Sequence, residues 1–370
     1  MTSRSVDAAG APRLRTLAVI PARGGSKGIP RKNVCPIAGK PLLAWAIQAV
    51  QQSGVVDDIV VSTDDAEIAR LAQRFGAQPL TRGPGLAEDA VTLDPVIADA
   101  VEQLEALGKQ YDLVLTVQPT SPLLRPQTVA RIVARFAEDV DTILTVMDDT
   151  HLCWQQGDAG PVPAYAARVN RQQLPRRFRE TGGVLATRRS LVTPKSRIGR
   201  RVAIEVLDSF EGIDIDDRND WLMAEAALKR KRIAFVTIGN RKVGLGHVSR
   251  VMTLLSGLNA HTVKIFCAPE HVLAIERFQS SYHDVEVVAK HGLLDALKQF
   301  GASLVVHDEL DTDPEQIRME LAQGMKVVVF EDNGPGQALA TLAFNELFSA
   351  EHTNAAQKRW YGPDVYCLRD

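Results

Sequence analysis

The sequence predicts an α/β protein with two domains. Short runs rich in Val, Ile and Leu alternate with longer segments whose apolar residues recur at helical spacing. This alternation is typical of a parallel sheet covered by helices. A second alternation of the same kind begins at residue 231, and 370 residues are enough for two domains of ordinary size.

Composition narrows the class of protein further. Hydrophobic residues make up 45% of the chain and charged residues 24%, which is typical of a globular protein with a packed core. The net charge of −2 gives no basic surface for nucleic acid or for an anionic membrane. No apolar run approaches the ~20 residues that cross a bilayer. The four cysteines lack metal-ligand spacing, so we expect reduced thiols and a cytoplasmic protein.

The first domain is expected to cover residues 16–230, after a disordered tail at residues 1–15. A strand at Leu17–Ala22 leads into a glycine-rich loop, and the helix that follows stops at Gly54. Asp64 has Glu67 three residues later, which is the capping-box pattern at the start of a helix that ends at Gly76. The other expected helices are Pro41–Ser53, Leu93–Leu107, one through Val129–Phe136, and Asp217–Leu228. The other expected strands are Ile59–Ser62, Leu113–Val117, Thr142–Val146, Gly183–Ala186 and Ala203–Val206.

Two segments interrupt this pattern. The stretch from Asp148 to Arg179 is rich in Gln, Arg and Pro, and we expect loops there. The basic run Lys229–Arg232 marks the boundary to the second domain, residues 231–370. In that domain the clearest helix is Val248–Leu258. The expected strands are Ile233–Ile238, Val263–Phe266, Val285–Val288, Leu304–Val306 and Val327–Phe330.

The most informative run follows the first strand and reads Pro21-Ala-Arg-Gly-Gly-Ser-Lys-Gly-Ile-Pro-Arg-Lys-Asn33. Glycine lets the backbone approach a phosphate, and successive loop N–H groups can surround an anion. Arg23, Lys27 and Lys32 add side-chain charge for a triphosphate. The spacing matches neither a Walker A loop nor G-x-G-x-x-G. We therefore interpret the run as a different kind of phosphate loop, in preference to a basic surface turn.

Two later runs strengthen this interpretation. Gln118-Pro-Thr-Ser-Pro-Leu123 follows a buried strand, so its polar groups should emerge at the same edge of the sheet. Asp214 and Asp216 are two residues apart, which in an extended segment places both carboxylates on one side. Two such oxygen ligands suit Mg²⁺ that also holds triphosphate oxygens, although surface acids alone are the commoner explanation of this pattern.

These runs resemble the CMP-sialic acid synthetases, also called acylneuraminate cytidylyltransferases. Four blocks in the family's order carry the resemblance, over residues 16–229: Ile20–Asn33, Val61-Ser-Thr-Asp-Asp65, Gln118–Leu123, and Gly212–Asp216 followed by Asp220-Trp221. Kdo cytidylyltransferases have a different first loop. The resemblance implies a Rossmann-like nucleotidyltransferase domain, CTP as the donor, Mg²⁺ as the cofactor, a nonulosonic acid as the acceptor and a homodimer.

The resemblance also assigns residues to roles. It implies Asp214 and Asp216 as metal ligands, and Arg23, Lys27 and Asp216 as catalytic residues. The residues implied to bind CTP are Arg23, Gly24, Gly25, Ser26, Lys27, Lys32, Asn33, Arg82 and Asp89. Those implied to contact the sugar acid are Gln118, Arg171 and Gln172. Relatives usually have Asn-Gly-Ala where this chain has Thr181-Gly182-Gly183, which bears on the acceptor more than on the chemistry.

The chemistry expected of this site is nucleotidyl transfer. The anomeric hydroxyl of the acceptor attacks the α-phosphorus of CTP, and pyrophosphate leaves. The protein mainly positions the reactants and offsets charge. Asp216, or a metal-bound water, is our candidate for accepting the hydroxyl proton.

The second domain carries a histidine turn, Gly244-Leu-Gly-His-Val-Ser-Arg250, between a strand and a helix. With Val305–Asp308, it resembles the N-terminal half of the nucleotide-sugar hydrolase of pseudaminic acid synthesis, a GT-B-type enzyme. That resemblance implies a half GT-B fold and a base at His247; a capping histidine in a tight turn is the plainer interpretation. Because the nucleotide-binding half of such enzymes does not follow, we expect no hydrolase activity from this domain alone.

Two other functions stay open. The chain could transfer a nucleotide to a different acceptor, or it could act as a scaffold whose second domain recruits a partner enzyme. Intact Arg23, Lys27, Asp214 and Asp216 argue against an inactive scaffold. The sequence does not rank sialic acid, Kdn, legionaminic acid and pseudaminic acid as acceptors.

Overall fold

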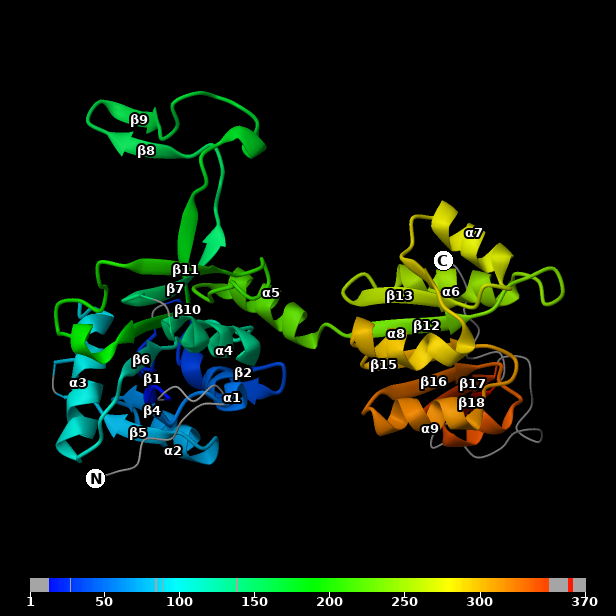
Figure 1. Cartoon of the computed structure of the whole chain (residues 1–370), viewed down its shortest axis with the longest axis horizontal. Helices are drawn as coiled ribbons and strands as arrows, with labels where there is room; N and C mark the ends of the chain where they lie inside the picture. The colour runs from blue at the N-terminus through cyan, green and yellow to red at the C-terminus, as the bar shows by residue number, and fades with distance from the viewer. Residues whose placement is uncertain are drawn as a thin grey trace. The chain divides into compact units, whose positions relative to one another are not determined.

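A computed structural model describes residues 13–26, 28–83, 85–88, 90–137, 139–345 and 359–361. The chain divides between Leu228 and Lys229 into two compact units, here called unit 1 and unit 2 (Figure 1). Both are mixed layers of helices and strands, as the sequence predicts. Each unit is built on its own seven-stranded sheet.

Unit 1 has the sheet order β11-β7-β10-β6-β1-β4-β5. Its main strands are β1 (Thr16–Pro21), β4 (Asp58–Thr63), β5 (Gln78–Thr81), β6 (Leu113–Thr116), β7 (Thr142–Asp148), β10 (Phe178–Arg188) and β11 (Val202–Val206). Its helices are α1 (Leu42–Ser53), α2 (Ala66–Arg74), α3 (Leu93–Ala106), α4 (Pro126–Ala134) and α5 (Arg218–Lys229). A small pair, β2 (Pro36–Ile37) and β3 (Lys40–Pro41), follows the glycine loop.

Alternating strand residues divide the core of unit 1 between the two faces of the sheet. Ala18 and Ile20 of β1 pack with apolar residues of α1, α2 and α4. Leu17 and Val19 pack on the opposite face with those of α3. A third cluster joins Ile213 and Ile215 to α5 and to the residues around β2, so it fixes the acidic segment beside the glycine loop.

Unit 1 departs from the expected parallel sheet at one strand. β10 runs antiparallel to both β6 and β7, whereas β1, β4, β5 and β6 are parallel. The cause is the segment between β7 and β10. It leaves the carboxyl end of β7 and re-enters the sheet at that same end without a crossover helix, so β10 runs in the opposite direction. This segment, expected to be loops, also contains a hairpin of β8 (Trp154–Gly157) and β9 (Gly160–Pro163), visible beyond the sheet in Figure 1.

Three smaller expectations also change. Residues 13–15, expected in the tail, are tied to the domain: Arg13 pairs with Asp57, and the Arg15 amide donates to Asp112. Residues 1–12 lie outside the described residues. The helix through Val129 ends at Ala134 and continues as a 3-10 turn, Arg135–Ala137. The N-cap of α2 is Asp65, not Asp64, because the Asp64 carboxylate turns toward the glycine loop.

Unit 2 has an entirely parallel sheet in the order β14-β13-β12-β15-β16-β17-β18. The strands are β12 (Arg232–Thr237), β13 (Thr262–Cys267), β14 (Val285–Val287), β15 (Leu304–Asp308), β16 (Lys326–Phe330), β17 (Leu342–Asn345) and β18 (Arg359–Tyr361). The helices are α6 (Gly246–Ser256), α7 (Val272–Ser280), α8 (Leu293–Phe300) and α9 (Pro314–Ala322). α6 and α7 pack on one face, and α8 and α9 on the other.

Both sheets reverse their strand order beside the first strand. From β1 the chain builds outward to β4 and β5, and then returns to place β6 on the other side of β1. In unit 2, β13 and β14 extend one way from β12, and β15 lies on its other side. Open α/β sheets bind ligands at the carboxyl ends of strands at such a reversal. The fold therefore provides one such location in each unit.

Candidate active site

The glycine loop of unit 1 is held closed by its own polar groups. The Asn33 side-chain amide donates to the Arg23 carbonyl at 3.0 Å, and the Gly24 amide donates to Asp64 Oδ1 at 2.9 Å. Asn33 is buried. Two of the groups expected to contact the nucleotide, the Asn33 amide and the Gly24 N–H, therefore maintain the loop. Gly25 and Ser26 are more open, and Lys27 lies outside the described residues.

Two glycines of the loop allow close approaches that a side chain would block. A Cβ on Gly28 would lie 2.2 Å from the Asp216 carbonyl oxygen, and a Cβ on Gly24 would lie 2.7 Å from Asp65 Oδ2. Real contacts of Cβ atoms are longer, and the Asp216 carbonyl is backbone that cannot easily move, so position 28 requires glycine; at position 24 the Asp65 carboxylate would have to shift. The loop consequently packs directly on the segment that carries the predicted metal ligands.

Asp65 anchors the outer side of the loop. Its Oδ1 accepts the amides of Glu67 and Ile68 at 2.8 and 3.0 Å, which caps α2. Its Oδ2 accepts from Arg31 at 2.7 Å, and Arg31 also pairs with Glu67. The Arg31 hydrogen bond, assisted by the two amides, lowers the pKa of Asp65. The charged side chain of Asp65 thus links the glycine loop to the N-terminus of α2.

Arg82 reaches the same edge from the end of β5. It is only 9% exposed, and its Nε donates to the carbonyl and hydroxyl oxygens of Ser62, both at 3.2 Å. Burial lowers the pKa of Arg82, and Asp64 partly offsets this effect, while Arg23 adds to it. Arg82, Arg23 and Asp64 therefore act on one another electrostatically. Asp89 lies outside the described residues.

The predicted metal ligands flank a buried isoleucine. Ile215 is fully buried, and its amide donates to the Thr120 carbonyl at 2.8 Å, which fixes Asp214 and Asp216 on either side of it. Partial desolvation of its carboxylate, and then the neighbouring Asp214 carboxylate, raise the pKa of Asp216, although the residue as a whole is exposed. Lys32 Nζ donates to the Ile215 carbonyl; burial lowers the pKa of Lys32, and Asp216 and Asp214 partly offset this.

These residues fit a divalent cation. Asp214 Oδ1 is buried without a hydrogen-bond partner, and the repulsion of Asp216 by Asp214 is offset only in part by Lys32. Both are hard oxygen donors of the kind that Mg²⁺ prefers. Within the described residues no set of three or more His, Cys, Asp or Glu side chains forms a metal site. The remaining ligands would have to be water or substrate oxygens, as is usual for Mg²⁺.

Two hydroxyls at this edge were missed from the sequence. Thr120 Oγ1 and Ser121 Oγ are buried and lack a hydrogen-bond partner. A Cβ on Gly182 would lie 3.1 Å from Ser121 Oγ and 3.0 Å from Asp214 Oδ2, so Ser121 and Asp214 line the same spot. The backbone amide of Gln118 donates to the Gly182 carbonyl at 3.0 Å. The sequence signal that could have identified Thr120 and Ser121 is their position in the polar run that follows β6.

The remaining predicted contacts with the acceptor lie elsewhere in unit 1. Arg171 and Gln172 form, with Gln173, a 3-10 helix between β9 and β10, and both are exposed. In the described part of the chain, neither makes a hydrogen bond to the sheet-edge residues above. Thr181, at the family's Asn position, donates its hydroxyl to Thr145 Oγ1 at 2.8 Å and has a structural role.

Unit 2 places His247 at the start of α6 in a buried ionic cluster. Its Nδ1 lies 2.7 Å from Asp308 Oδ1, and Arg250 donates to both oxygens of Asp308 at 2.9 and 2.8 Å. His247 is 8% exposed, and Asp308 is completely buried. A carboxylate at Nδ1 orients the imidazole and favours the tautomer in which Nε2 accepts a proton.

Unit 1 therefore combines a cation-bearing glycine loop with two carboxylates at the carboxyl edge of an α/β sheet, which is the arrangement of a nucleotide-binding enzyme. A family model described as "Cytidylyltransferase" matches residues 17–164. The CMP-N,N'-diacetyllegionaminic acid synthase of Legionella pneumophila is 32% identical over 233 residues, covering 60% of this chain and all of that protein. The chain belongs to the cytidylyltransferase family of the CMP-sialic acid synthetases.

Other relatives match over part of their length. The pseudaminic acid cytidylyltransferase of Campylobacter jejuni is 36% identical over 132 residues, which cover 35% of this chain and 57% of that protein. The N-acylneuraminate cytidylyltransferase A of Danio rerio is 30% identical over 221 residues, which cover 58% of this chain and 50% of that protein. The chain thus spans only about half the length of these two relatives. In the described residues no helix has the length and apolarity needed to span a membrane.

Proposed function

We propose that unit 1 is a CTP-dependent cytidylyltransferase that converts a nonulosonic acid to its CMP-sugar and releases pyrophosphate. The observation that carries the proposal is the contact between Gly28 and the backbone of Asp216, which brings the cationic loop and the acidic pair to one edge of the sheet. A triphosphate needs cations and metal oxygen ligands side by side. The printed activities of the relatives support CTP and a sugar acid as substrates.

Each residue is proposed to have a role in binding or in charge compensation. Arg23, Lys27 and Arg82 bind the triphosphate, and the amides of Gly25 and Ser26 approach it most openly. Lys32 and Asn33 contribute from the base of the loop. Asp214 and Asp216 hold Mg²⁺, which when bound supplies positive charge to the phosphate oxygens. Asp216, or a water held at the metal site, accepts the proton of the acceptor hydroxyl.

The acceptor is proposed as a class and not as a single sugar. The three relatives named above are described by three different acids: pseudaminic, diacetyllegionaminic and N-acylneuraminic acid. Gln118 and the unpartnered hydroxyls of Thr120 and Ser121 are placed to bind it beside the acidic pair. We also propose a homodimer, because Arg171 and Gln172 are exposed, and a second copy could bring them to the acceptor. A CTP-consuming enzyme is expected to act in the cytoplasm.

The test is a substrate panel on the full chain. CTP is combined with sialic acid, Kdn, legionaminic acid or pseudaminic acid, and pyrophosphate and CMP-sugar are measured with Mg²⁺ and with EDTA. We expect one or more acids to react, only with the divalent metal, and UTP to replace CTP poorly. CTP binding without reaction of any acid would point to a different acceptor. Failure to bind CTP would remove the assignment of the donor site.

A further inference from the structure

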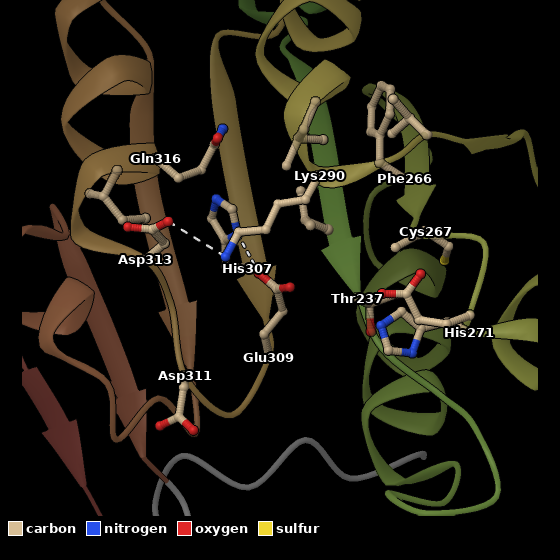
Figure 2. A pocket seen from close by; sticks show the side chains of 16 residues that line it. Thr237, Phe266, Cys267, His271, Lys290, His307, Glu309, Asp311, Asp313 and Gln316 are labelled. Carbon is tan, nitrogen blue, oxygen red and sulfur yellow. Dashed lines mark hydrogen bonds and ion pairs between the residues drawn. The ribbon is translucent and has the colours of Figure 1, made fainter.

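Unit 2 contains a pocket that belongs neither to the proposed transferase site nor to the His247 cluster. Residues from the carboxyl ends of β12, β13 and β15 and from the starts of α8 and α9 line it. It therefore lies where the strand order of the second sheet reverses, the location at which open α/β sheets bind small molecules. Figure 2 shows Asp311 and Asp313 on the left of the view, Glu309 near its middle, and Thr237 and Cys267 on the right.

One buried group in this pocket lacks a partner. Thr237 is 1% exposed, and its hydroxyl oxygen has no hydrogen-bond partner. A buried hydroxyl without a partner is unfavourable, so such groups normally form a hydrogen bond. Because Thr237 lines the pocket, a ligand that offers a donor or an acceptor at this point would complete its bonding.

The charge of the lining restricts the kind of ligand. Four carboxylates, those of Glu270, Glu309, Asp311 and Asp313, face the pocket, against the cations of Lys290 and His307. Both cations are already paired: Lys290 lies 3.5 Å from Asp313, and His307 contacts Glu309 at 2.8 Å and Glu320 at 2.9 Å. Four carboxylates against two cations leave the lining with an excess of negative charge, which disfavours phosphates and carboxylates.

Two further features of the pocket argue against an anion or a metal ion. The N-terminus of α9, which could attract an anion, is capped by Asp313, whose carboxylate accepts the Glu315 amide at 3.0 Å. Burial, and then Glu309, raise the pKa of Cys267 to about 12, so the thiol stays neutral and is a poor metal ligand.

The pocket also has an apolar side. Phe266, Leu293 and Ile317 contribute to its lining. Acidic side chains beside an aromatic and two aliphatic side chains suit a ligand with a positive charge on an apolar body. We propose that this pocket binds a small organic ammonium compound, with the ammonium directed to the carboxylates and to the Thr237 hydroxyl.

The test uses three probes that share a cyclohexane ring and differ in charge: cyclohexylammonium, cyclohexanol and cyclohexanecarboxylate. Binding to the full chain is measured near neutral pH by saturation-transfer NMR and titration. We expect the ammonium probe to bind several-fold more tightly than the alcohol, and the carboxylate not to bind. Equal binding of the ammonium and carboxylate probes, or no binding of the ammonium probe, overturns the proposal.

Matched variants locate the binding. Thr237→Val keeps the shape of the side chain, removes only a hydroxyl that has no partner in the fold, and should weaken the ammonium probe roughly three- to tenfold. Asp311→Asn changes an exposed side chain and should also weaken it. Asp284→Asn makes the same charge change before β14, at the opposite edge of the sheet, and should leave binding unchanged. Equal losses in the Asp311 and Asp284 variants would show a non-specific charge effect and refute the site.

Discussion

The carboxyl edges of the two sheets share a reversal of strand order but bring different charged groups together. In unit 1 the loop after β1 brings Arg23, Arg31 and Lys32 to the edge, and carboxylates such as Asp65 are paired with them. In unit 2 the turns after β13 and β15 bring acids instead, and these outnumber the cations. The reversal of strand order sets where a ligand site forms, and the few loop residues at that point set the charge of what binds. Shared fold between the units therefore does not imply a shared ligand.

The largest expected effect tests the acidic pair in unit 1. Asp216→Asn should lower cytidylyltransferase turnover by roughly 10²–10³-fold, because it removes a metal ligand and the proposed proton acceptor. Asp216 is exposed, so the melting temperature should stay near that of the parent. Steady-state kinetics and thermal unfolding check both points. The matched control, Asp158→Asn, lies in the exposed β8–β9 turn and should leave turnover unchanged. Near-normal turnover in Asp216→Asn would remove this pair from the mechanism.

A second prediction concerns the pH dependence of unit 2. Burial alone would lower the pKa of His307, but Glu320 and Glu309 outweigh it and raise the pKa to about 10. A folded-state pKa above the unfolded value of about 6.5 adds stability below that value, and the contribution is lost as pH rises toward about 10. The free energy of unfolding should therefore fall between neutral and alkaline pH, with a slope of at most about 1.4 kcal/mol per pH unit.

Urea titrations across this pH range measure that slope. His307→Gln keeps hydrogen-bonding capacity, removes the titration, and should flatten the curve. Tyr282→Phe is a suitable control, because that side chain is 99% exposed. A slope that persists in His307→Gln would assign the pH dependence to another group.

A third, smaller effect is expected at Asp65, which links the glycine loop to α2. Asp65→Asn should cost roughly 0.3–1 kcal/mol of stability, because asparagine can still cap α2 but lacks the negative charge at the helix N-terminus, and it should raise the KM for CTP several-fold by loosening Arg31. Because the pKa of Asp65 is lowered, its contribution is present above about pH 4 and is lost as pH falls through the folded-state value. The stability difference between the variant and the parent should shrink in acid. A difference that does not change with pH would show that the charge of Asp65 is unimportant.

The smallest expected effect is that of removing unit 2. Residues 1–230 alone should retain full CMP transfer, because every residue proposed for the transferase lies in unit 1, which ends at Leu228. The full chain should release no UDP from a UDP-sugar, and His247→Asn should leave CMP transfer unchanged. Loss of transfer in the shortened chain would show that unit 2 helps to order the first site. Release of UDP would show that the His247 cluster is a complete active site.

Sequence reasoning identified local patterns in unit 1 more readily than the bonding of their residues. The glycine loop and the Asp214–Asp216 pair are local patterns, so a single chain segment reveals each of them. The hydrogen bond of Asn33 to the Arg23 carbonyl forms only within the folded loop, and which of Asp64 and Asp65 caps α2 depends on where β4 ends. The direction of β10 is a property of the whole sheet. None of these follows from residue spacing alone.

The pocket of unit 2 was not predicted, for a related reason. Its key side chains, Thr237, Cys267 and Glu309, come from three strands or the turns after them, and no short motif joins them. Only the parallel register of β13, β12 and β15 brings these strand ends together. A site assembled in this way becomes visible when the topology is known.

The segment between β7 and β10 offers a place for engineering. Asp148 and Phe178 are paired across the two strands, and the Asp149 amide donates to the Arg177 carbonyl at 2.9 Å, so the ends of the segment already meet. A foreign peptide of almost any length could be grafted between them without changing the spacing of the strands. Segments that contact the acceptor could thus be exchanged there while the glycine loop and the acidic pair stay in register. The segment is therefore a suitable position at which to change the acceptor preference.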